Sequence, residues 1–171
     1  VPIGLPCGAW DLAILFGPAV DGPTLADAAA IAALWNPWIR DTAITFASVE
    51  KTAADIVSLI EARPCFFVAE TTGLLGFATY GQFRGGDGYA TCMEHTVILS
   101  PDARGQGAGR ALLQAVEAHA RAGGAHQMIA GVSGENPDAR AFHAAQGYHE
   151  VAILREAGFK FGRFMNLVLM Q

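Results

Sequence analysis

The chain has 171 residues, of which 52% are hydrophobic and 16% charged, and its formal net charge is −5. This length suits one globular domain with its own core, and the composition excludes an intrinsically disordered chain. Few Lys and Arg side chains are available to contact a phosphate backbone, so we expect no nucleic-acid partner. The high apolar content favours burial of surface against a second copy, and we expect a homodimer.

The cysteines and histidines give no pattern typical of a metal site. Cys7, Cys65 and Cys92 are odd in number and are not spaced as metal ligands, and the five histidines form no helical zinc pair. We therefore expect no metal, and reduced thiols in the cytoplasm. Residues 1–16 are apolar, but they lack a basic start and are too short to span a bilayer, so we expect neither a secretory signal nor a membrane partner.

The first third of the chain predicts one strand and two helices. Residues 11–16 form a short apolar run that is typical of an opening strand. Thr24 is a candidate N-cap for a helix over residues 25–34, which we expect to end near Asn36 and Pro37. A second helix is expected over residues 51–63, because apolar residues recur on one face and Pro64 follows.

Strands dominate the middle of the chain. Residues 66–69 and 74–80 flank the turn at Thr72 and Gly73 and predict a hairpin. A glycine-rich connection over residues 84–88 leads to a longer strand over residues 89–99.

The last third of the chain alternates helices and strands. The spacing predicts a helix from Gly109 to residue 122, a strand over 128–132, a helix over 137–146, and strands over 151–154 and 164–170. This order of elements indicates a mixed α/β or α+β fold rather than a regular βαβ alternation.

A glycine-rich loop, Arg104-Gly105-Gln106-Gly107-Ala108-Gly109, lies between the predicted strand and helix. Its glycines free backbone N–H groups to turn inward at a helix N-terminus, which favours a phosphate group, with charged hydrogen bonds from Arg104 and Arg110. An ordinary glycine-rich turn is the alternative. Arg110 and Ala111 stand where a nucleotide-hydrolysing P-loop needs Lys and Ser or Thr, and a dinucleotide fingerprint would need glycine at 110.

This loop resembles the Arg/Gln-x-x-Gly-x-Gly/Ala signature of the GNAT acetyltransferase superfamily. Residues 93–97, 136–148 and 158–163 are similar to the branch of phosphinothricin and methionine sulfoximine N-acetyltransferases. The resemblance implies one GNAT domain over residues 11–171 after an extension of residues 1–10. It also implies an α/β (α+β) GNAT fold, with a central, mixed, mostly antiparallel twisted sheet of about seven strands flanked by about four helices.

The resemblance implies acetyl-CoA as co-substrate. In that family the backbone of the central strand pairs with the pantetheine arm, the glycine-rich loop holds the pyrophosphate, and an Asn before the late helix contacts the arm. The implied cofactor-binding residues are Val97, Ile98, Leu99, Arg104, Gly105, Gln106, Gly107, Ala108, Gly109, Arg110, Asn136 and His143. Asn136 is equally suited to a plain helix N-cap.

Glu94 is the candidate general base. Acetyl transfer needs a neutral amine, so a base must take the proton of the ammonium form. Glu94 lies in an apolar strand, where desolvation would raise its pKa, although a structural role satisfied by other groups is the alternative. The matching Glu in the resembling branch is the base, and a backbone N–H near Val97 would stabilise the developing oxyanion.

His143 is the candidate proton donor to the leaving CoA thiolate, because many GNAT enzymes have a Tyr at this position. A cofactor contact, or a solvated place on the helix surface, are its alternatives. Cys92 is the nucleophile that a two-step route would need, but no His or Asn partner is evident, so we expect direct transfer.

The resembling branch acts on small amines of amino-acid type, which implies a cation for the carboxylate and an apolar wall. Phe46, Arg84 and Tyr89, together with Glu94, are the candidate substrate-binding residues. Arg163 would face the substrate or a dimer partner, or is an exposed charge at a strand end. Two alternatives stay open: a GNAT enzyme for another amine, such as a polyamine, an antibiotic or a protein N-terminus, and a non-catalytic acetyl-CoA sensor.

Overall fold

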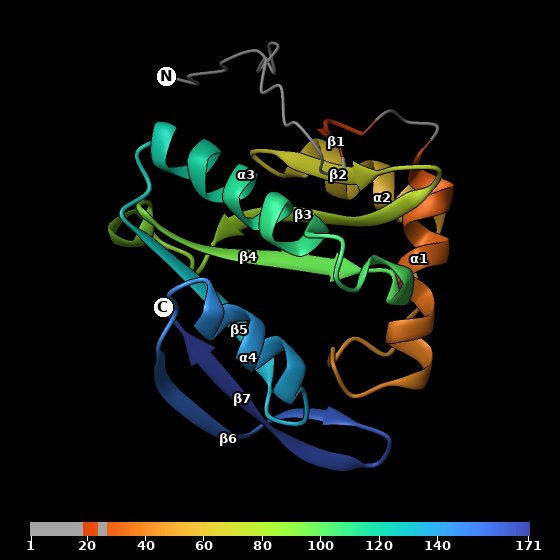
Figure 1. Ribbon diagram of the computed structural model, residues 1–171. Helices are drawn as coiled ribbons and strands as arrows, with labels where there is room; N and C mark the ends of the chain where they lie inside the picture. Colours follow the sequence, from red (N-terminus) through yellow and green to blue (C-terminus); the bar gives the residue numbers. More distant parts are fainter. Residues whose placement is uncertain (1–18, 24–26) are drawn as a thin grey trace.

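A computed structural model describes residues 19–23 and 27–171 of the chain (Figure 1). The expected strand over residues 11–16 and the expected Thr24 cap lie outside these residues. The strands are β1 (Ala19–Asp21), β2 (Phe66–Glu70), β3 (Leu74–Gln82), β4 (Cys92–Leu99), β5 (Gln127–Ser133), β6 (Glu150–Lys160) and β7 (Arg163–Met170). The helices are α1 (Ala28–Asp41), α2 (Ala53–Ala62), α3 (Ala108–Ala122) and α4 (Pro137–Ala145), with short 3₁₀ turns η2 (Asp87–Tyr89) and η3 (Pro101–Ala103).

The strands form one seven-stranded sheet in the order β1-β2-β3-β4-β5-β7-β6. Neighbouring strands are antiparallel except β4 and β5, which are parallel. Apolar side chains of α1 and α2 pack on one face of the sheet, and those of α3 and α4 pack on the other (Figure 1). The expected mixed, mostly antiparallel sheet flanked by helices is confirmed.

Helix α1 is longer than expected. It continues through Pro37 to Asp41, although a proline inside a helix costs about 3 kcal/mol. Contacts with other elements offset this cost: Asn36 exchanges two hydrogen bonds with the backbone of Lys51, and Trp38 Nε1 donates to the carbonyl of Leu99 at 2.9 Å. Ile39 is fully buried. The expected end near Asn36 and Pro37 was wrong because tertiary contacts override the local helix-breaking signal.

Strand β4 begins at Cys92, three residues later than expected. Tyr89 and Ala90 instead belong to tight turns, in which their N–H groups donate to the carbonyls of Gly86 and Asp87. The side-chain amide of Gln82 also donates to the carbonyls of Arg84 and Gly86, at 2.6 Å each. These local hydrogen bonds compete with strand pairing and hold the connection as a compact loop.

Strand β6 extends to Lys160, well beyond the expected end at residue 154. The register with β7 shifts between Leu154 and Gly158, where Glu156 has φ 55°. Phe161 and Gly162 then form a two-residue turn with φ 51° and 72°, which is typical of the hairpin turn that fits the twist of two strands. Because of this irregularity, residues 155–160 do not continue the simple alternation from which a strand is predicted.

Candidate active site

The parallel strands β4 and β5 separate in the middle of the sheet. Their register covers Cys92 to His95 on β4 and ends at the pair His95 and Ala130. Beyond this point β4 continues to Leu99 beside β3 alone. The β5-facing edge of β4 therefore offers unpaired backbone groups that an extended ligand can meet.

The ladder with β3 determines which backbone groups face this gap. Phe83 N–H donates to the Cys92 carbonyl at 2.9 Å, and Ser100 N–H donates to the Leu75 carbonyl at 2.7 Å. Because hydrogen-bonded pairs alternate along an antiparallel ladder, the backbone of Ile98 points toward β3, and the backbones of Val97 and Leu99 point toward the gap. Ile98 therefore does not fit the expected backbone contact with a pantetheine arm.

The glycine-rich loop leads from η3 into α3. Gly105 and Gly107 have φ 77° and 76°, in the left-handed region, and a Cβ on either would meet nothing within 4 Å. Glycine is needed there for the backbone conformation, and the space beside it is open. Gly109 is different, because its Cβ would lie 2.9 Å from Leu99 Cδ1 and 3.2 Å from the Phe142 ring. It allows α3 to pack closely on the end of β4.

The N-terminus of α3 fits an anionic group. Its N-cap residue is Gly107, which provides no capping side chain, so the first N–H groups of the helix, on Ala108, Gly109 and Arg110, have no intrahelical acceptors. Such N–H groups and the helix dipole favour a phosphate. The residues present therefore fit the pyrophosphate of acetyl-CoA, as the sequence pattern predicts.

The two arginines at this loop differ. Arg104 donates to Asp138 of α4 at 2.7 Å, and both side chains are largely exposed. Such an exposed pair contributes little to stability and can exchange its partner for a phosphate. Arg110 is exposed and forms no salt bridge among the described residues.

Glu94 lies on the face of the sheet that packs against α1 and α2, just before the two strands separate. Its carboxylate reaches onto β5, so that a Cβ on Gly131 would lie 2.6 Å from Glu94 Oε1 and 3.6 Å from Leu167 Cδ1. The Glu94 carboxyl is half-buried, and this desolvation raises its pKa, although the nearby Arg63 acts in the opposite direction. A carboxylate with a raised pKa beside an open strand edge is suited to accept a proton near neutral pH.

Phe46 supplies an apolar wall on the same face. It comes from the loop after α1, and a Cβ on Gly158 would overlap its ring. Gly158 pairs with Met165, which shares a face with Leu167 because side chains alternate along a strand. The structure thus brings Phe46 and Glu94 to one face of the sheet, as the candidate substrate site requires.

Lys160 holds the loop that carries Phe46, and sequence reasoning missed it. Its side chain is only 4% exposed, and Nζ donates to the carbonyls of Thr42 and Thr45 at 2.6 and 2.8 Å. Burial lowers the pKa of Lys160. The sequence gives no local signal for this role, because the acceptors lie more than 100 residues away in the chain.

Arg84 and Tyr89 lie together in the loop between β3 and β4. The Arg84 guanidinium is 5.7 Å from the centre of the Tyr89 ring, in a cation–π contact. Neither side chain is hydrogen-bonded to Glu94 in the described part of the chain. The Arg163 guanidinium is paired with another side chain, since it donates through both terminal nitrogens to Glu135.

His143 is buried rather than solvated on the helix surface. It is 6% exposed, and its Nδ1 lies 2.7 Å from the carbonyl of Ala139, so Nδ1 carries the proton. Burial lowers the pKa of His143, which favours the neutral ring. In this tautomer Nε2 is an acceptor without a hydrogen, and it has no hydrogen-bond partner. The arrangement fits a contact to a donor group better than proton donation.

His95 stacks on His143 with ring centres 5.1 Å apart. Neither nitrogen of His95 has a hydrogen-bond partner, and burial lowers its pKa to about 3.

Asn136 caps α4 by accepting from Ala139 N–H at 3.0 Å, which confirms its capping role. Cys92 carries a free thiol at the start of β4.

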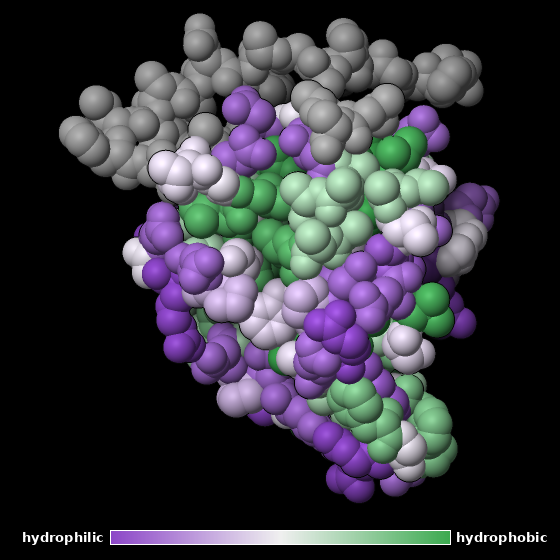
Figure 2. Space-filling model, turned by 90° about the vertical axis from the view of Figure 1, so that its right-hand side faces the viewer, coloured by the Kyte–Doolittle hydropathy of each residue, from purple (hydrophilic) through white to green (hydrophobic). Residues whose placement is uncertain are grey.

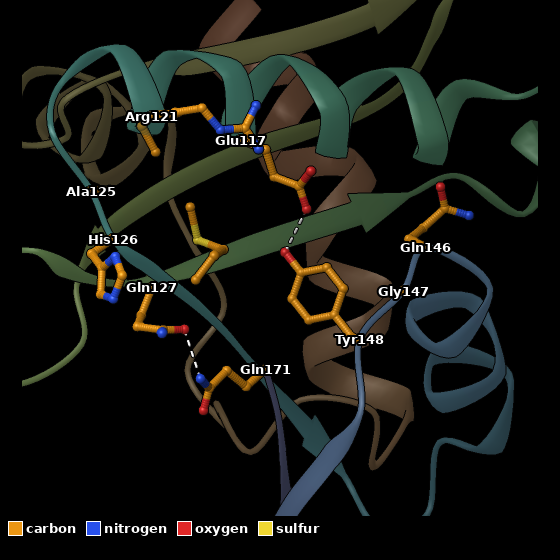
Figure 3. A pocket seen from close by; sticks show the side chains of 11 residues that line it. Glu117, Arg121, Ala125, His126, Gln127, Gln146, Gly147, Tyr148 and Gln171 are labelled. Carbon is orange, nitrogen blue, oxygen red and sulfur yellow. Dashed lines mark hydrogen bonds between the residues drawn. The ribbon is translucent and has the colours of Figure 1, made fainter.

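A separate hollow of about 270 Å³ lies on the opposite, α3 side of the sheet (Figure 3). The Tyr148 hydroxyl donates to Glu117 there at 2.7 Å, and the side chains of Gln127 and Gln171 pair beside it. Glu94 does not line this hollow. We take the β4–β5 gap as the candidate active site, because the candidate base Glu94 and the free edge of β4 lie there and the glycine-rich loop follows the end of β4.

Residues 19–23 and 27–171 contain neither a candidate metal cluster nor a helix that could span a membrane. These residues contain no group of three or more His, Cys, Asp or Glu side chains that could hold a metal ion. None of the helices described is long and apolar enough to cross a membrane.

Sequence comparisons agree with this geometry. The family model described as Acetyltransferase (GNAT) family matches residues 31–148. An L-amino acid N-acyltransferase of Escherichia coli is 34% identical over 151 residues, which cover 85% of this chain and 88% of that protein. A phosphinothricin N-acetyltransferase of Alcaligenes faecalis is 35% identical over 151 residues, which cover 85% of this chain and 77% of that protein.

Solved structures with the same fold include a GNAT superfamily phosphinothricin acetyltransferase from Sinorhizobium meliloti in complex with acetyl-CoA. It has a TM-score of 0.83 and 26% identity, and the match covers 90% of this chain and 86% of that one. A ribosomal-protein-alanine N-acetyltransferase from Brucella melitensis has a TM-score of 0.84 and 31% identity, with 89% and 97% covered. The chain belongs to the GNAT family of acetyltransferases.

Proposed function

We propose that this chain transfers the acetyl group of acetyl-CoA directly to the α-amine of a small amino acid or analogue, such as methionine sulfone, methionine sulfoximine or phosphinothricin. The observation that carries the proposal is Glu94, a half-buried carboxylate with a raised pKa that lies beside the strand gap, on the same face of the sheet as Phe46. The names of the relatives support this substrate class, because they act on L-amino acids, methionine sulfoximine or phosphinothricin.

In the proposed reaction Glu94 takes one proton from the substrate ammonium, directly or through a water molecule. The neutral nitrogen can then form the new C–N bond as the C–S bond breaks and the sulfur leaves as a thiolate. The acylated nitrogen loses its second proton, which balances the proton that the thiolate takes up to become the CoA thiol. Acetyl-CoA supplies the acetyl group as a thioester when it is bound. The backbone N–H of Val97 faces the gap and would stabilise negative charge on the carbonyl oxygen.

The residues that we propose for binding acetyl-CoA follow from the same geometry. Backbone groups of Val97 and Leu99 would meet the pantetheine arm, although the Leu99 carbonyl already accepts from Trp38. The pyrophosphate would lie on the N–H groups that begin α3, with Arg104 and Arg110 beside it. We keep His143 as a cofactor-binding residue rather than a proton donor, because a neutral ring protonated on Nδ1 has no proton to give at Nε2.

For substrate binding we keep Phe46 as the apolar wall, and Tyr89 and Arg84 as residues of the loop between β3 and β4. Direct transfer is proposed because Cys92 shows no hydrogen bond to a histidine among the described residues. We also propose the cytoplasm as the compartment, which fits the free thiol of Cys92.

A homodimer is proposed because apolar side chains cluster on the hairpin of β6 and β7. β6 is an edge strand of the sheet, and its hairpin exposes Val151, Ile153, Leu154, Phe159, Phe161 and Phe164. Figure 2 shows hydrophobic surface at the lower end of the molecule, where this hairpin lies. A second copy would cover both the edge and the apolar patch. Sedimentation of Phe159→Ser/Phe164→Ser against wild type tests this, since the change should yield monomers.

The test of function is release of the CoA thiol from acetyl-CoA with a panel of amines. The panel contains methionine sulfone, methionine sulfoximine, phosphinothricin, spermidine and a short peptide, with binding of acetyl-CoA measured separately. Turnover of the amino-acid analogues, with little turnover of spermidine or peptide, is expected. Binding of acetyl-CoA without turnover of any amine would contradict the proposal and favour a sensor. Absence of acetyl-CoA binding would contradict the assigned cofactor site.

A further inference from the structure

Arg63 is a cation on the substrate face that the sequence pattern did not single out. It follows the last residue of α2, and its side chain is exposed. The guanidinium extends over Gly81 of β3, since a Cβ on Gly81 would overlap Nη1 and lie 3.2 Å from Cζ. Among the described residues, Arg63 has no salt bridge that would occupy it. The absence of a side chain at position 81 makes room for the guanidinium there.

Gly81 lies directly opposite Glu94 in the β3–β4 ladder. Residues of such a hydrogen-bonded pair have Cα atoms about 5.5 Å apart and share a face of the sheet. The guanidinium over Gly81 and the carboxylate of Glu94 are therefore neighbours. They are close enough for the charge of Arg63 to counteract the rise in the pKa of Glu94 that desolvation causes, yet no ion pair joins them.

This spacing matches the two charged groups of an α-amino acid. The ammonium and carboxylate of an amino acid are attached to one carbon, so a site for both needs a base and a cation side by side with space between them. A guanidinium presents parallel N–H groups that suit a carboxylate. The amine would face Glu94 while the carboxylate faces Arg63, and the side chain would extend toward Phe46.

We propose that Arg63 binds the α-carboxylate of the substrate and thereby sets the preference for α-amino acids over amines without this group. The inference rests on the proposed function and assigns the carboxylate to Arg63 rather than to Arg84. Arg84 is the weaker candidate because it lies in the β3–β4 loop, three residues beyond Gly81, against the Tyr89 ring. The guanidinium of Arg63, by contrast, lies over Gly81 of β3, which pairs with Glu94 of β4.

The experiment compares methionine sulfone with its α-carboxamide, which keeps the amine and the side chain but lacks the negative charge. KM and kcat are measured for wild type, Arg63→Gln, Arg63→Lys and Arg84→Gln, with circular dichroism to check folding. In Arg63→Gln we expect KM for the sulfone to rise about tenfold or more, because one charged hydrogen-bonding partner is lost. Any change in kcat that comes from removing the charge beside Glu94 should be the same for the sulfone and the carboxamide. KM for the carboxamide should not change. Arg63→Lys should restore part of the affinity.

Gly81→Ala is a second variant that does not remove Arg63. Its Cβ would meet only atoms of the Arg63 side chain, which can move, so the fold should persist while the guanidinium is displaced. KM for the sulfone should rise in this variant too, by less than in Arg63→Gln. The carboxamide again serves as the internal control.

The outcomes separate this inference from the proposed function. If wild type acetylates neither compound, the proposed function fails and the inference fails with it. If wild type acetylates methionine sulfone but Arg63→Gln leaves its KM unchanged, or raises the KM of sulfone and carboxamide equally, the inference alone is overturned. A rise that is specific to the sulfone and occurs only in Arg84→Gln would also overturn it, because the carboxylate would then belong to Arg84.

Discussion

Glu94 and His95 are adjacent on β4, yet the sheet gives them opposite environments. Both carry a titratable side chain without a hydrogen-bond partner among the described residues. His95 is 6% exposed on the α3 side, where its ring stacks on His143 and meets the Tyr148 ring edge to face, and burial lowers its pKa to about 3. The Glu94 carboxyl is only half-buried on the other face, where burial raises its pKa and Arg63 opposes the rise.

The difference shows what makes a perturbed pKa useful for catalysis. Both groups are shifted by desolvation, but only Glu94 remains accessible and has an adjacent cation that keeps ionisation within reach. His95 is held neutral in an aromatic cluster that contributes packing. Because side chains alternate between the two faces of a strand, the proposed base and a packing residue can be adjacent in the sequence.

The largest expected effect is the loss of activity in Glu94→Gln. The variant keeps the shape of the side chain but cannot accept a proton, and general-base catalysis typically contributes 10²–10⁴-fold, so kcat/KM for methionine sulfone should fall by about 100-fold or more. Acetyl-CoA affinity, measured by calorimetry, should stay within about twofold. A variant with unchanged kcat/KM would show that another group takes the proton.

His95 should instead affect stability at acidic pH. Its folded-state pKa of about 3 lies below the ordinary 6.5, so below pH 6.5 the unfolded chain binds a proton that the folded chain does not. Stability should therefore decline as pH falls from 6.5 toward 3, by ~1.4 kcal/mol per pH unit, or ~2 kcal/mol at pH 5.

Urea unfolding of wild type and His95→Phe at pH 7 and pH 5 measures this decline. The substitution preserves the aromatic packing and removes the titrating group, so its stability should fall by ~2 kcal/mol less than that of wild type between the two pH values. His149→Phe, at an exposed position, is the matched control. Equal acid sensitivity of wild type and His95→Phe would contradict the buried, neutral state of His95.

Gly131→Ala should disturb Glu94 without removing it. The new Cβ would lie 2.6 Å from Glu94 Oε1, so the carboxylate must move while the rest of the strand can stay in place. We expect kcat to fall about tenfold, because displacing a catalytic group by an ångström is costly. The thermal midpoint should change by less than it does in Gly109→Ala, whose Cβ meets Leu99 and Phe142 at the packed end of α3.

The smallest expected effect concerns the loop that carries Phe46. Lys160→Met removes the donor that bonds the carbonyls of Thr42 and Thr45, at a cost of ~1 kcal/mol. KM for methionine sulfone should rise about fivefold, with a small change in kcat. Lys51→Met, at the other lysine of the chain, should leave KM unchanged. An equal KM in Lys160→Met and wild type would show that the loop holds Phe46 without this anchor.

The predictable parts of the molecule were those with a local physical signal. The helix after Gly109, the hairpin at Gly73 and the glycine-rich loop have periodicity or backbone requirements that are visible in the sequence, and the structure confirms these elements. Pro37 misled the prediction because distant partners, Lys51 and Leu99, stabilise the helix beyond it.

Site residues could be predicted where a single strand or loop carries the signal. They could not be predicted where their role depends on contacts between distant parts of the chain. Glu94 was visible as a carboxylate in an apolar strand. Arg63 looked like a helix-end charge, because its place over Gly81 depends on how α2 meets β3. The buried state of His143 and Lys160 likewise depends on neighbours from other elements.

The pH dependence of kcat/KM for methionine sulfone, measured from pH 5 to 9 in wild type and Glu94→Gln, tests the central claim most directly. Both enzymes should show the rise that comes from deprotonation of the free amine. Only wild type should also lose activity at low pH as Glu94 becomes protonated, with a midpoint above the ordinary carboxyl range because burial raises its pKa. Parallel profiles in the two enzymes would contradict the assignment of Glu94 as the base.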